Sequence, residues 1–441
     1  MKPQGLLIAV ALLAVLGGAI WFSNKRQTAS AAKTPATTET KILNIPEDQI
    51  QTIKIQHANG DIVELSKATG KWRLVQPKDL GADPDASSSL VSALTSVTAD
   101  KTIEDKAADV SQYGLVHPAL DVTIGRKDGK TNEILIGDDT PNNSGAYAKL
   151  PNDGHVYTVF SFVKTSLDKK LNDLRDKRLL TFDSDKLTRV ELTAKGQAIE
   201  FGKNAQSEWE ILKPRPLRAD SSTVDSLVTK LKDAKMDANI SADDAKKAAA
   251  GFASGTRVAT ASVSDSSGTQ TVEVRRDKDK NYFAKSTAVE GIFKISSDVG
   301  DALDKGLDDF RNKKIFDFGF SDPTKLEVNG AVYTKSGDKW MSGAKTMDNT
   351  SVQNLIDKLR DLSATKFAEK GGGDQVFTAT VTSNSGKRVE TATITKQGDQ
   401  YFAKRENEPS IYVLDSKAVD DLKAAASGVK EQTPSAASKK K

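Results

Sequence analysis

Few residues in this chain have the type and spacing that chemistry needs. The three histidines, His57, His117 and His155, all lie within one stretch of the sequence. A zinc site built from them would require three distant positions to converge, without the close spacing of helical ligand pairs. We therefore interpret them as exposed turn residues and expect no metal site.

Two short segments are similar to motifs of penicillin-binding proteins and β-lactamases. Ser161 and Lys164 have the spacing of the nucleophile motif, and Lys335-Ser336-Gly337 that of the later lysine motif. The Ser-x-Asn element is missing between them. The lysine segment also precedes a tryptophan, as does Lys67–Lys71, where a glycine serves a hairpin turn. We therefore expect no catalytic residue.

The acidic and glycine-rich segments do not match the motifs of calcium or phosphate sites either. Residues 277–281 begin like a calcium loop, but Tyr282 stands where such a loop needs glycine. Asp138 and Asp139 follow an apolar strand, and a loosely bound cation is the alternative to a plain acidic turn there. Residues 125–130 fall one residue short of a phosphate loop. We expect no cofactor and no enzymatic activity.

Composition restricts the partners. The 64 basic and 60 acidic residues nearly cancel and alternate along the chain. A nucleic-acid-binding face needs clustered lysine and arginine, so we expect no nucleic-acid partner. The chain contains no cysteine, which excludes disulfides, thiolate metal sites and a lipid-modified N-terminal cysteine.

An apolar segment near the N-terminus, Leu6–Phe22, is typical of membrane targeting. As a helix it would rise about 26 Å, slightly less than the ~30 Å hydrocarbon core. We expect an uncleaved anchor; the alternative is a signal peptide cleaved at Ala29-Ser30-Ala31, beyond the charges of Lys25-Arg26. The predicted location is the cell inner membrane, single-pass, with the soluble part facing the periplasm or outside.

A tandem repeat must position all these residues. Trp72, Trp209 and Trp340 lie in near-copies of one local sequence, and alternating apolar residues before each predict an antiparallel meander. We expect the tryptophans in the core, with a surface that stacks on glycan rings as the alternative. An aspartate follows each tryptophan and is expected to cap a helix. These aspartates are Asp83, Asp220 and Asp348.

The segment after each aspartate carries apolar residues at the spacing of one buried helical stripe. In the second copy these are Val224, Leu227, Val228, Leu231 and Ala234, and in the third Val352, Leu355, Ile356, Leu359 and Leu362. Further strands and a closing helix follow in each copy. Arg175 and Arg311 end the first two closing helices, where positive charge complements the helix dipole. The third copy is expected to lack this outgoing connector.

These patterns predict an α+β protein of three tandem repeats, each an antiparallel β-meander plus two helices, behind an N-terminal transmembrane helix. The expected segments are a transmembrane anchor at 1–22, a flexible linker at 23–40, repeat 1 at 41–179, repeat 2 at 180–314, repeat 3 at 315–428 and a disordered basic tail at 429–441.

The chain resembles the bacterial domain-of-unknown-function 4340 family. The resemblance rests on Trp72 to Pro77 with Ala82-Asp83, on Tyr113-Gly114-Leu115 with Pro118, on Leu174 to Lys177, and on Trp209 to Pro214 with Ala219-Asp220. The third copy keeps Trp340 and Asp348 but lacks the proline. The family has no established catalytic residues. Its members are often encoded beside ABC-type transport systems akin to those of gliding motility, which implies an accessory role in an envelope complex.

The expected function is therefore that of a membrane-tethered extracytoplasmic scaffold or accessory protein of an envelope complex. The resemblance implies that this complex is associated with an ABC-type transport system. Its expected partners are the membrane, through the N-terminal helix, and a protein of that envelope or transporter complex. The alternative is a binding protein for an envelope polymer, either glycan or lipid.

Overall fold

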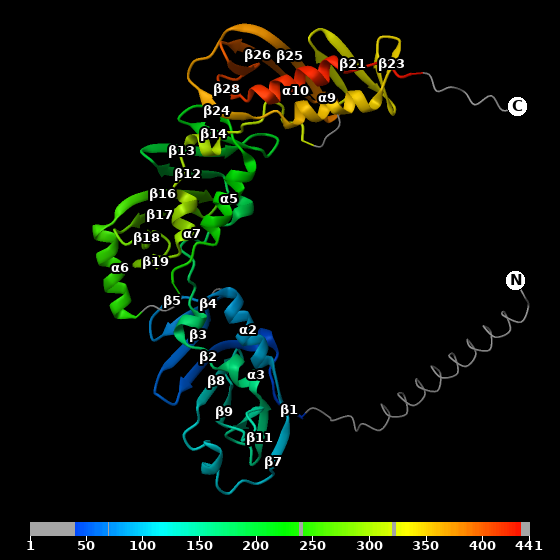
Figure 1. Ribbon diagram of the computed structural model, residues 1–441. Coiled ribbons are helices and arrows are strands. Elements are labelled where there is room, and N and C mark those ends of the chain that lie inside the picture. The colour runs from blue at the N-terminus through cyan, green and yellow to red at the C-terminus, as the bar shows by residue number, and fades with distance from the viewer. Residues whose placement is uncertain (1–39, 69, 238–240, 320–322, 434–441) are drawn as a thin grey trace, which may run out of the picture. The chain divides into compact units, whose positions relative to one another are not determined.

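The chain folds into repeats with separate hydrophobic cores. The computed structural model describes residues 40–68, 70–237, 241–319 and 323–433. Two compact units divide the chain, the first ending at Asp176 and the second beginning at Lys177 (Figure 1). Unit 1 contains repeat 1, and unit 2 contains repeats 2 and 3, each of which has its own core.

Repeat 1 is built on a nine-stranded antiparallel sheet. In sheet order its strands are β5 (Leu80–Gly81), β4 (Lys71–Gln76), β3 (Ile62–Ala68), β2 (Ile50–His57), β8 (Leu120–Arg126), β9 (Thr131–Asp139), β10 (Gly145–Lys149), β11 (Val156–Phe160) and β7 (Lys101–Glu104). A two-stranded sheet pairs β1 (Thr40–Asn44) with β6 (Ser96–Ala99). The helices are α2 (Pro84–Thr95), α3 (Ser161–Leu167) and α4 (Leu171–Leu174), with short 3-10 turns η1 (Glu47–Gln49) and η2 (Ser111–Tyr113).

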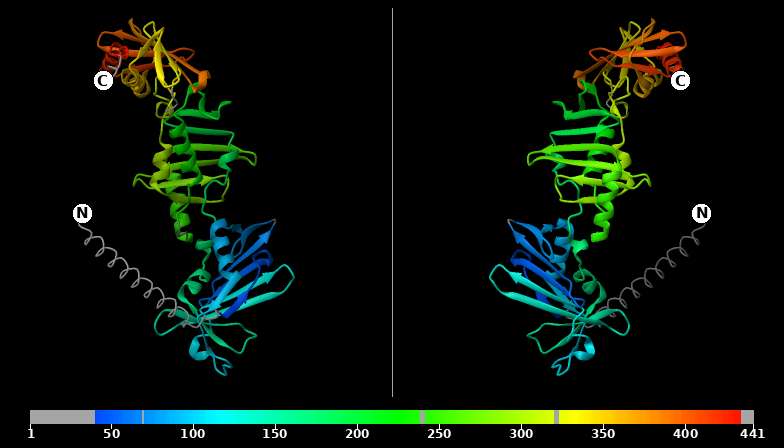
Figure 2. Two further views of the ribbon diagram at one scale, coloured as in Figure 1. Left: turned by 90° about the vertical axis from the view of Figure 1, so that its right-hand side faces the viewer. Right: turned by 90° about the vertical axis from the view of Figure 1, so that its left-hand side faces the viewer.

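Repeat 2 has an eight-stranded sheet of the same plan. Its strands, in sheet order, are β15 (Leu217–Arg218), β14 (Trp209–Lys213), β13 (Gln197–Lys203), β12 (Arg189–Ala194), β16 (Thr256–Asp265), β17 (Gly268–Arg276), β18 (Tyr282–Ser286) and β19 (Ile292–Ile295). The helices are α5 (Ser221–Lys232), α6 (Ala242–Ser254), α7 (Ser297–Leu303) and α8 (Leu307–Phe310), and a 3-10 turn, η3 (Ser184–Lys186), precedes β12. The sheet of this repeat forms one layer with helices against its face (Figure 2).

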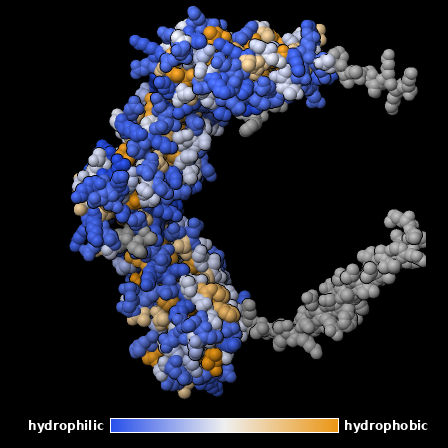
Figure 3. Space-filling view, in the orientation of Figure 1, coloured by the Kyte–Doolittle hydropathy of each residue, from blue (hydrophilic) through white to orange (hydrophobic). Residues whose placement is uncertain are grey.

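Repeat 3 returns to nine strands. They are β23 (Lys345–Met347), β22 (Lys339–Ser342), β21 (Ala331–Ser336), β20 (Lys325–Val328), β25 (Asp374–Ser383), β26 (Arg388–Gln397), β27 (Gln400–Arg405), β28 (Ile411–Leu414) and β24 (Ala364–Ala368). The helices are α9 (Asn349–Asp361) and α10 (Ser416–Ser427), and η4 (Asn384–Gly386) is a 3-10 turn. Hydrophilic residues cover most of the face in Figure 3, as expected for sheets whose helices bury the apolar side.

The predicted helix starts are confirmed. The carboxylates of Asp83, Asp220 and Asp348 each accept hydrogen bonds from backbone amides in the first turn of α2, α5 and α9. The predicted stripes are buried in the cores of repeats 2 and 3. Local sequence therefore determines where these helices begin and which face packs on the sheet.

Each of these capping aspartates also closes its repeat through its backbone. The amide of Asp83 donates to the carbonyl of Leu174 at 2.8 Å, and that of Asp220 donates to Phe310 at 2.8 Å. In repeat 3 the amide of Asp348 donates to Lys430 at 2.9 Å, and Glu431 pairs with Met347. Repeat 3 thus keeps the connector pairing, which corrects the expectation that it lacks one.

The expected α+β class is wrong, because the fold is mostly antiparallel β. Strand forms 44% and helix 25% of the structure, in four antiparallel sheets. The sequence predicts one meander per repeat, with further strands after its first helix, and in the structure these strands, β8–β11, β16–β19 and β25–β28, form a second meander beside the first. The long hairpins β16–β17 and β25–β26 belong to this second meander, and their strands alternate apolar and polar residues.

The described residues contain no helix whose length and apolar character suit a membrane span. The expected transmembrane helix of the fold prediction, at 1–22, lies outside the described residues, as do the linker up to residue 39 and the end of the tail from 434.

Candidate functional site

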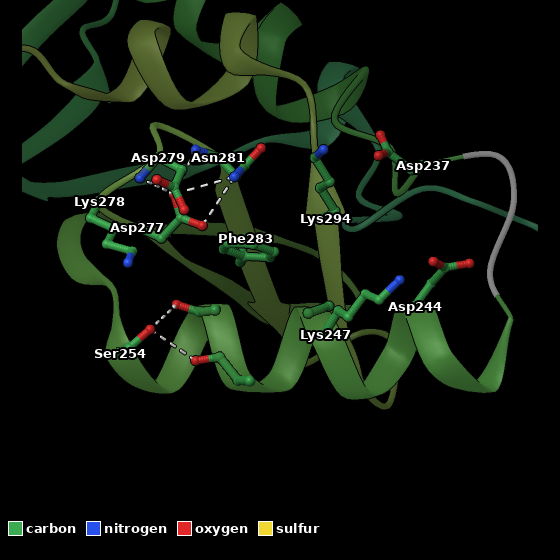
Figure 4. A pocket seen from close by; sticks show the side chains of 13 residues that line it. Asp237, Asp244, Lys247, Ser254, Asp277, Lys278, Asp279, Asn281, Phe283 and Lys294 are labelled. Atoms are coloured by element: carbon green, nitrogen blue, oxygen red, sulfur yellow. Dashed lines mark hydrogen bonds between the residues drawn. The ribbon is translucent and has the colours of Figure 1, made fainter.

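A groove beside α6 in repeat 2 has a volume of about 970 Å³. It lies between α6 and the strands β18 and β19, next to the turn that joins β17 to β18 (Figure 4). Its charged and amide lining residues are Asp237, Asp244, Lys247, Asp277, Lys278, Asp279, Asn281 and Lys294. We call this cavity the α6 groove.

The groove exists because repeat 2 departs from its neighbours at the sheet edge. In repeats 1 and 3 the segment after the first helix forms an edge strand, β7 or β24, that pairs with the last strand of the meander. In repeat 2 the equivalent chain pairs only briefly with β19, through Met236 to Ile295 and the amide of Asp237 to the carbonyl of Lys294 at 3.0 Å. The chain then forms α6, whose residues line one side of the groove.

Local sequence explains why α6 forms at this place. Ser241 and Asp244 make a capping box, in which each side chain accepts a 3.1 Å bond from the other residue's amide. The Ser241 hydroxyl and amide hold the pKa of the Asp244 carboxyl below its usual value. Alanine and lysine, both strong helix formers, fill much of the helix.

Packing of α6 on the sheet depends on a glycine. The buried face of the helix includes Ala248 and Phe252, which contact Phe283 of β18. A Cβ atom added at Gly251 would lie 2.4 Å from the Phe283 ring. Only a residue without a side chain lets the helix approach this closely.

The turn at one end of the groove fixes its acidic groups. Asp277 Oδ1 accepts backbone bonds from Asp279 at 2.9 Å and Asn281 at 2.8 Å. Burial alone would raise the pKa of Asp277, but these bonds and that from the Asn281 side chain hold it below its usual value. Its carboxylate therefore serves the hairpin, which agrees with a polar turn in place of a calcium loop.

The groove carries carboxylates at both ends and lysine side chains along its length. Figure 4 shows Asp277, Asp279 and Asn281 at one end, Asp237 and Asp244 toward the other, and Phe283 between them. Lys247 extends from α6, whereas Lys294 comes from β19. Ser254, the hydroxyl in the lining, donates to the carbonyl of Ala250 at 3.0 Å. The lining can therefore bind polar and charged groups, and its described residues include no nucleophile paired with a base.

The three histidines do not come together. His57 is buried, contrary to the expected turn: its Nε2 lies 3.0 Å from Asp168 and its Nδ1 3.4 Å from the carbonyl of Asp61. It lines a smaller cavity of about 500 Å³. His117 is exposed as expected. Over the ranges described, no group of three or more acidic or histidine side chains is arranged to hold a metal.

His155 takes part in a local cluster of repeat 1. Its Nδ1 contacts Asp153, whose other carboxylate oxygen accepts a 2.6 Å bond from Tyr157. Bonds from Tyr157 and His155 lower the pKa of Asp153 to about 2. Burial and the bond to Asp153 raise the pKa of Tyr157 to about 12. This cluster closes the turn between β10 and β11.

The residues of the motifs similar to those of acyl enzymes lie in α3 and at the end of β21. Ser161 is the first residue of α3, and Lys164 binds Asp139 at 2.7 Å, next to Asp138 at the end of β9. Lys335 and Ser336 end β21, and Gly337, at a φ of 58°, begins the turn to β22. Residues 125–130 likewise comprise the end of β8 and the turn from β8 to β9.

The tryptophans belong mainly to the cores, as predicted. Trp209 and Trp340 are each 5% exposed, and Trp72 packs partly buried against the core of repeat 1. Trp209 and Trp340 therefore offer no platform for stacking on glycan rings.

The arginines at the ends of the closing helices follow α4 and α8 directly, as expected. Arg311 does more than cap. Its guanidinium lies 3.3 Å from the ring centroid of Phe367 in repeat 3 and donates to the Ser410 hydroxyl at 2.9 Å. Arg218 of β15 also reaches across, to Glu408 at 3.0 Å. Charged contacts from the buried Arg311 and the half-buried Arg218 thus join repeats 2 and 3.

Comparison with known proteins agrees with this repeat organisation. The model of a family described as Domain of unknown function (DUF4340) matches residues 72–254 and 209–379. The chain belongs to the DUF4340 family. The two matches begin at Trp72 and Trp209, the equivalent residues of repeats 1 and 2. No curated protein and no solved structure matches the chain.

Proposed function

We propose that this DUF4340 protein is an extracytoplasmic scaffold or accessory protein of an envelope complex, tethered to the membrane by Leu6–Phe22, which holds a segment of a protein partner in the α6 groove. The observation that carries the proposal is the replacement of an edge strand by α6, because α6 borders a groove at the sheet edge where β7 and β24 pair with the last strand in the other two repeats. The family resemblance suggests an ABC-type transport system as the complex.

The chemistry of the lining favours a polypeptide segment. Small-molecule pockets are mostly apolar, with a few polar groups. The α6 groove instead carries carboxylates, ammonium groups and an amide along its length. These groups can bind the backbone and the charged side chains of an extended chain, whereas Phe283 supplies apolar surface between them. The alternative of an envelope polymer is tested by the same experiment.

Adjacent lysines on α6 provide a matched test. Lys247 lines the groove, while Lys246 is 83% exposed in its side chain and lies beside Asp243. We would place a photo-activated crosslinking amino acid at each position of the full chain in native envelopes. A discrete adduct at 247 that is absent at 246 and contains peptides of an envelope protein is expected. Equal labelling at both positions, or an adduct that contains only polysaccharide, would contradict a protein partner.

The tether is tested separately. The full chain should fractionate with membranes and retain Met1–Phe22 on intact-mass analysis. A protein that is free in the soluble fraction, with an N-terminus near Lys33, would contradict the tether but leave the groove experiment meaningful.

A further inference from the structure

Repeat 1 exposes a pair of stacked phenylalanines. Phe160 is 43% exposed and Phe162 is 65% exposed. Their ring centroids lie 5.8 Å apart with an interplanar angle of 13°. They are the only phenylalanines among the large hydrophobic residues that stand exposed in the described part of the chain. Scattered exposed aliphatic residues are ordinary, but two adjacent exposed rings form a patch.

The other repeats have a different residue at the equivalent place. Phe160 holds the N-cap position of α3 and makes no side-chain cap bond. In repeat 2 the N-cap of α7 is Ser296, and in repeat 3 that of α10 is Asp415, and both side chains accept a bond from a first-turn amide. Repeat 1 therefore lacks a stabilising cap and has an exposed ring in its place. This arrangement is expected where the ring contacts something outside the chain.

The position of the patch within unit 1 indicates what that partner is. The described chain begins at Thr40, which pairs with Ala99. Asp100 directly follows Ala99, and its amide donates a 2.7 Å hydrogen bond to the carbonyl of Thr158. Thr158 lies on β11, two residues before Phe160. The linker therefore enters unit 1 at the same corner as the phenylalanine pair. A random coil of 18 residues, the length of 23–40, spans about 23 Å root-mean-square.

We propose that Phe160 and Phe162 insert into the headgroup region of the membrane that carries the tether. This inference rests on the tether in the proposed function. Aromatic rings partition favourably at the membrane interface. Two rings alone bind weakly, but a short tether raises their effective concentration at the bilayer. The nearby charges Lys164 and Asp139 bind each other at 2.7 Å, so the contact depends on apolar burial more than on salt.

The test uses the full chain, which has no cysteine and accepts single labels. Thr165, exposed on α3, is replaced by cysteine and spin-labelled, and the protein is reconstituted in phosphatidylcholine vesicles. We expect oxygen dissolved in lipid to relax this label more strongly than a water-soluble nickel chelate does. A label at Lys417→Cys on α10 of repeat 3, equivalent to Phe162, serves as the water-exposed control.

The decisive variant combines Phe160→Ser with Phe162→Asp, the residues that repeat 2 has at these positions. Because serine restores the cap, the variant should fold at least as stably as the native chain, which thermal denaturation checks. The label at 165 should then become accessible to nickel, while the protein still floats with the vesicles.

Three outcomes would overturn the inference. One is a nickel-accessible label with the native phenylalanines present in floating vesicles. Another is a label that responds to soluble glycan fragments and not to lipid, which would assign the patch to carbohydrate. A protein that does not float overturns the tether as well, and so separates a failure of the proposed function from a failure of the phenylalanine contact alone.

Discussion

Trp209 donates a 2.7 Å hydrogen bond from its indole Nε1 to the carboxylate of Asp225. The bond joins β14 to α5, while the rest of the ring lies in the core of repeat 2. A buried tryptophan has one polar atom that needs a partner, and Asp225 supplies it. The residue that marks the repeat in the sequence therefore links the sheet to its first helix.

Replacing this side chain should destabilise repeat 2. Trp209→Ala removes a ring that is almost fully buried and should cost about 3–5 kcal/mol of unfolding free energy. Trp209→Phe keeps much of the ring and loses the bond to an exposed carboxylate, so its expected cost is about 1–2 kcal/mol. Urea denaturation measures both. A cost below about 1 kcal/mol for the alanine variant would mean that the ring is not a core group.

Gly251→Ala should loosen α6. In most helix interiors this change stabilises by about 1 kcal/mol, but here the new Cβ would lie 2.4 Å from the Phe283 ring. We expect a net cost of about 1–3 kcal/mol and faster hydrogen exchange in α6. Gly372→Ala is the control, because no atom lies within 4 Å of its Cβ position. Slower exchange in α6 of the Gly251 variant would refute the close packing.

The Asp153 cluster predicts an acid-sensitive contribution in repeat 1. Bonds from Tyr157 and His155 lower the pKa of the folded carboxyl to about 2, whereas the pKa of an unfolded aspartate is about 3.9. The ionised carboxylate of Asp153 therefore stabilises the fold fully above about pH 4, and this stabilisation is lost as the pH falls toward about 2. In Asp153→Asn this part of the pH dependence should disappear, which thermal denaturation over that range measures. An unchanged acid profile would show that the cluster does not stabilise the fold.

Arg311 should couple the unfolding of repeats 2 and 3. Arg311→Ala loses the contact with the Phe367 ring and the bond to Ser410, which together should contribute about 2–4 kcal/mol. We expect calorimetry to show one transition for the native pair of repeats and two transitions for the variant. Arg388→Ala is the control, since this arginine also crosses the junction, to Glu208, but is one-third exposed. Two transitions in the control alone would contradict this assignment.

Local features of the fold could be predicted from the sequence. Asp220 with its apolar stripe predicts α5, and Trp209 predicts a core strand, because capping and burial depend on neighbouring residues. The interpretation failed where distant segments meet. His57 is buried because Asp168, 111 residues further on, provides its partner. No short-range pattern contains that pairing.

The α6 groove was missed for a different reason. Ser241 and Asp244 have the spacing of a capping box before an alanine-rich segment, so the helix itself could have been predicted. The replacement of an edge strand by this helix could not, because it depends on which strand borders the sheet. The class was wrong for the same reason: pairing of the second meander with the first is a long-range property.

The backbone bonds from the capping aspartates have a consequence for the order of folding during synthesis. The amide of Asp83 has its partner only when Leu174 has been made, and Asp220 must wait for Phe310. A nascent repeat therefore stays open at its first helix until its own last residues emerge. Once they do, it closes before the next repeat is complete, so domains can mature one after another from the N-terminal side. If the repeats close in this order, only one sheet at a time is unfinished during synthesis. Only that sheet then has unpaired strand edges that could pair wrongly.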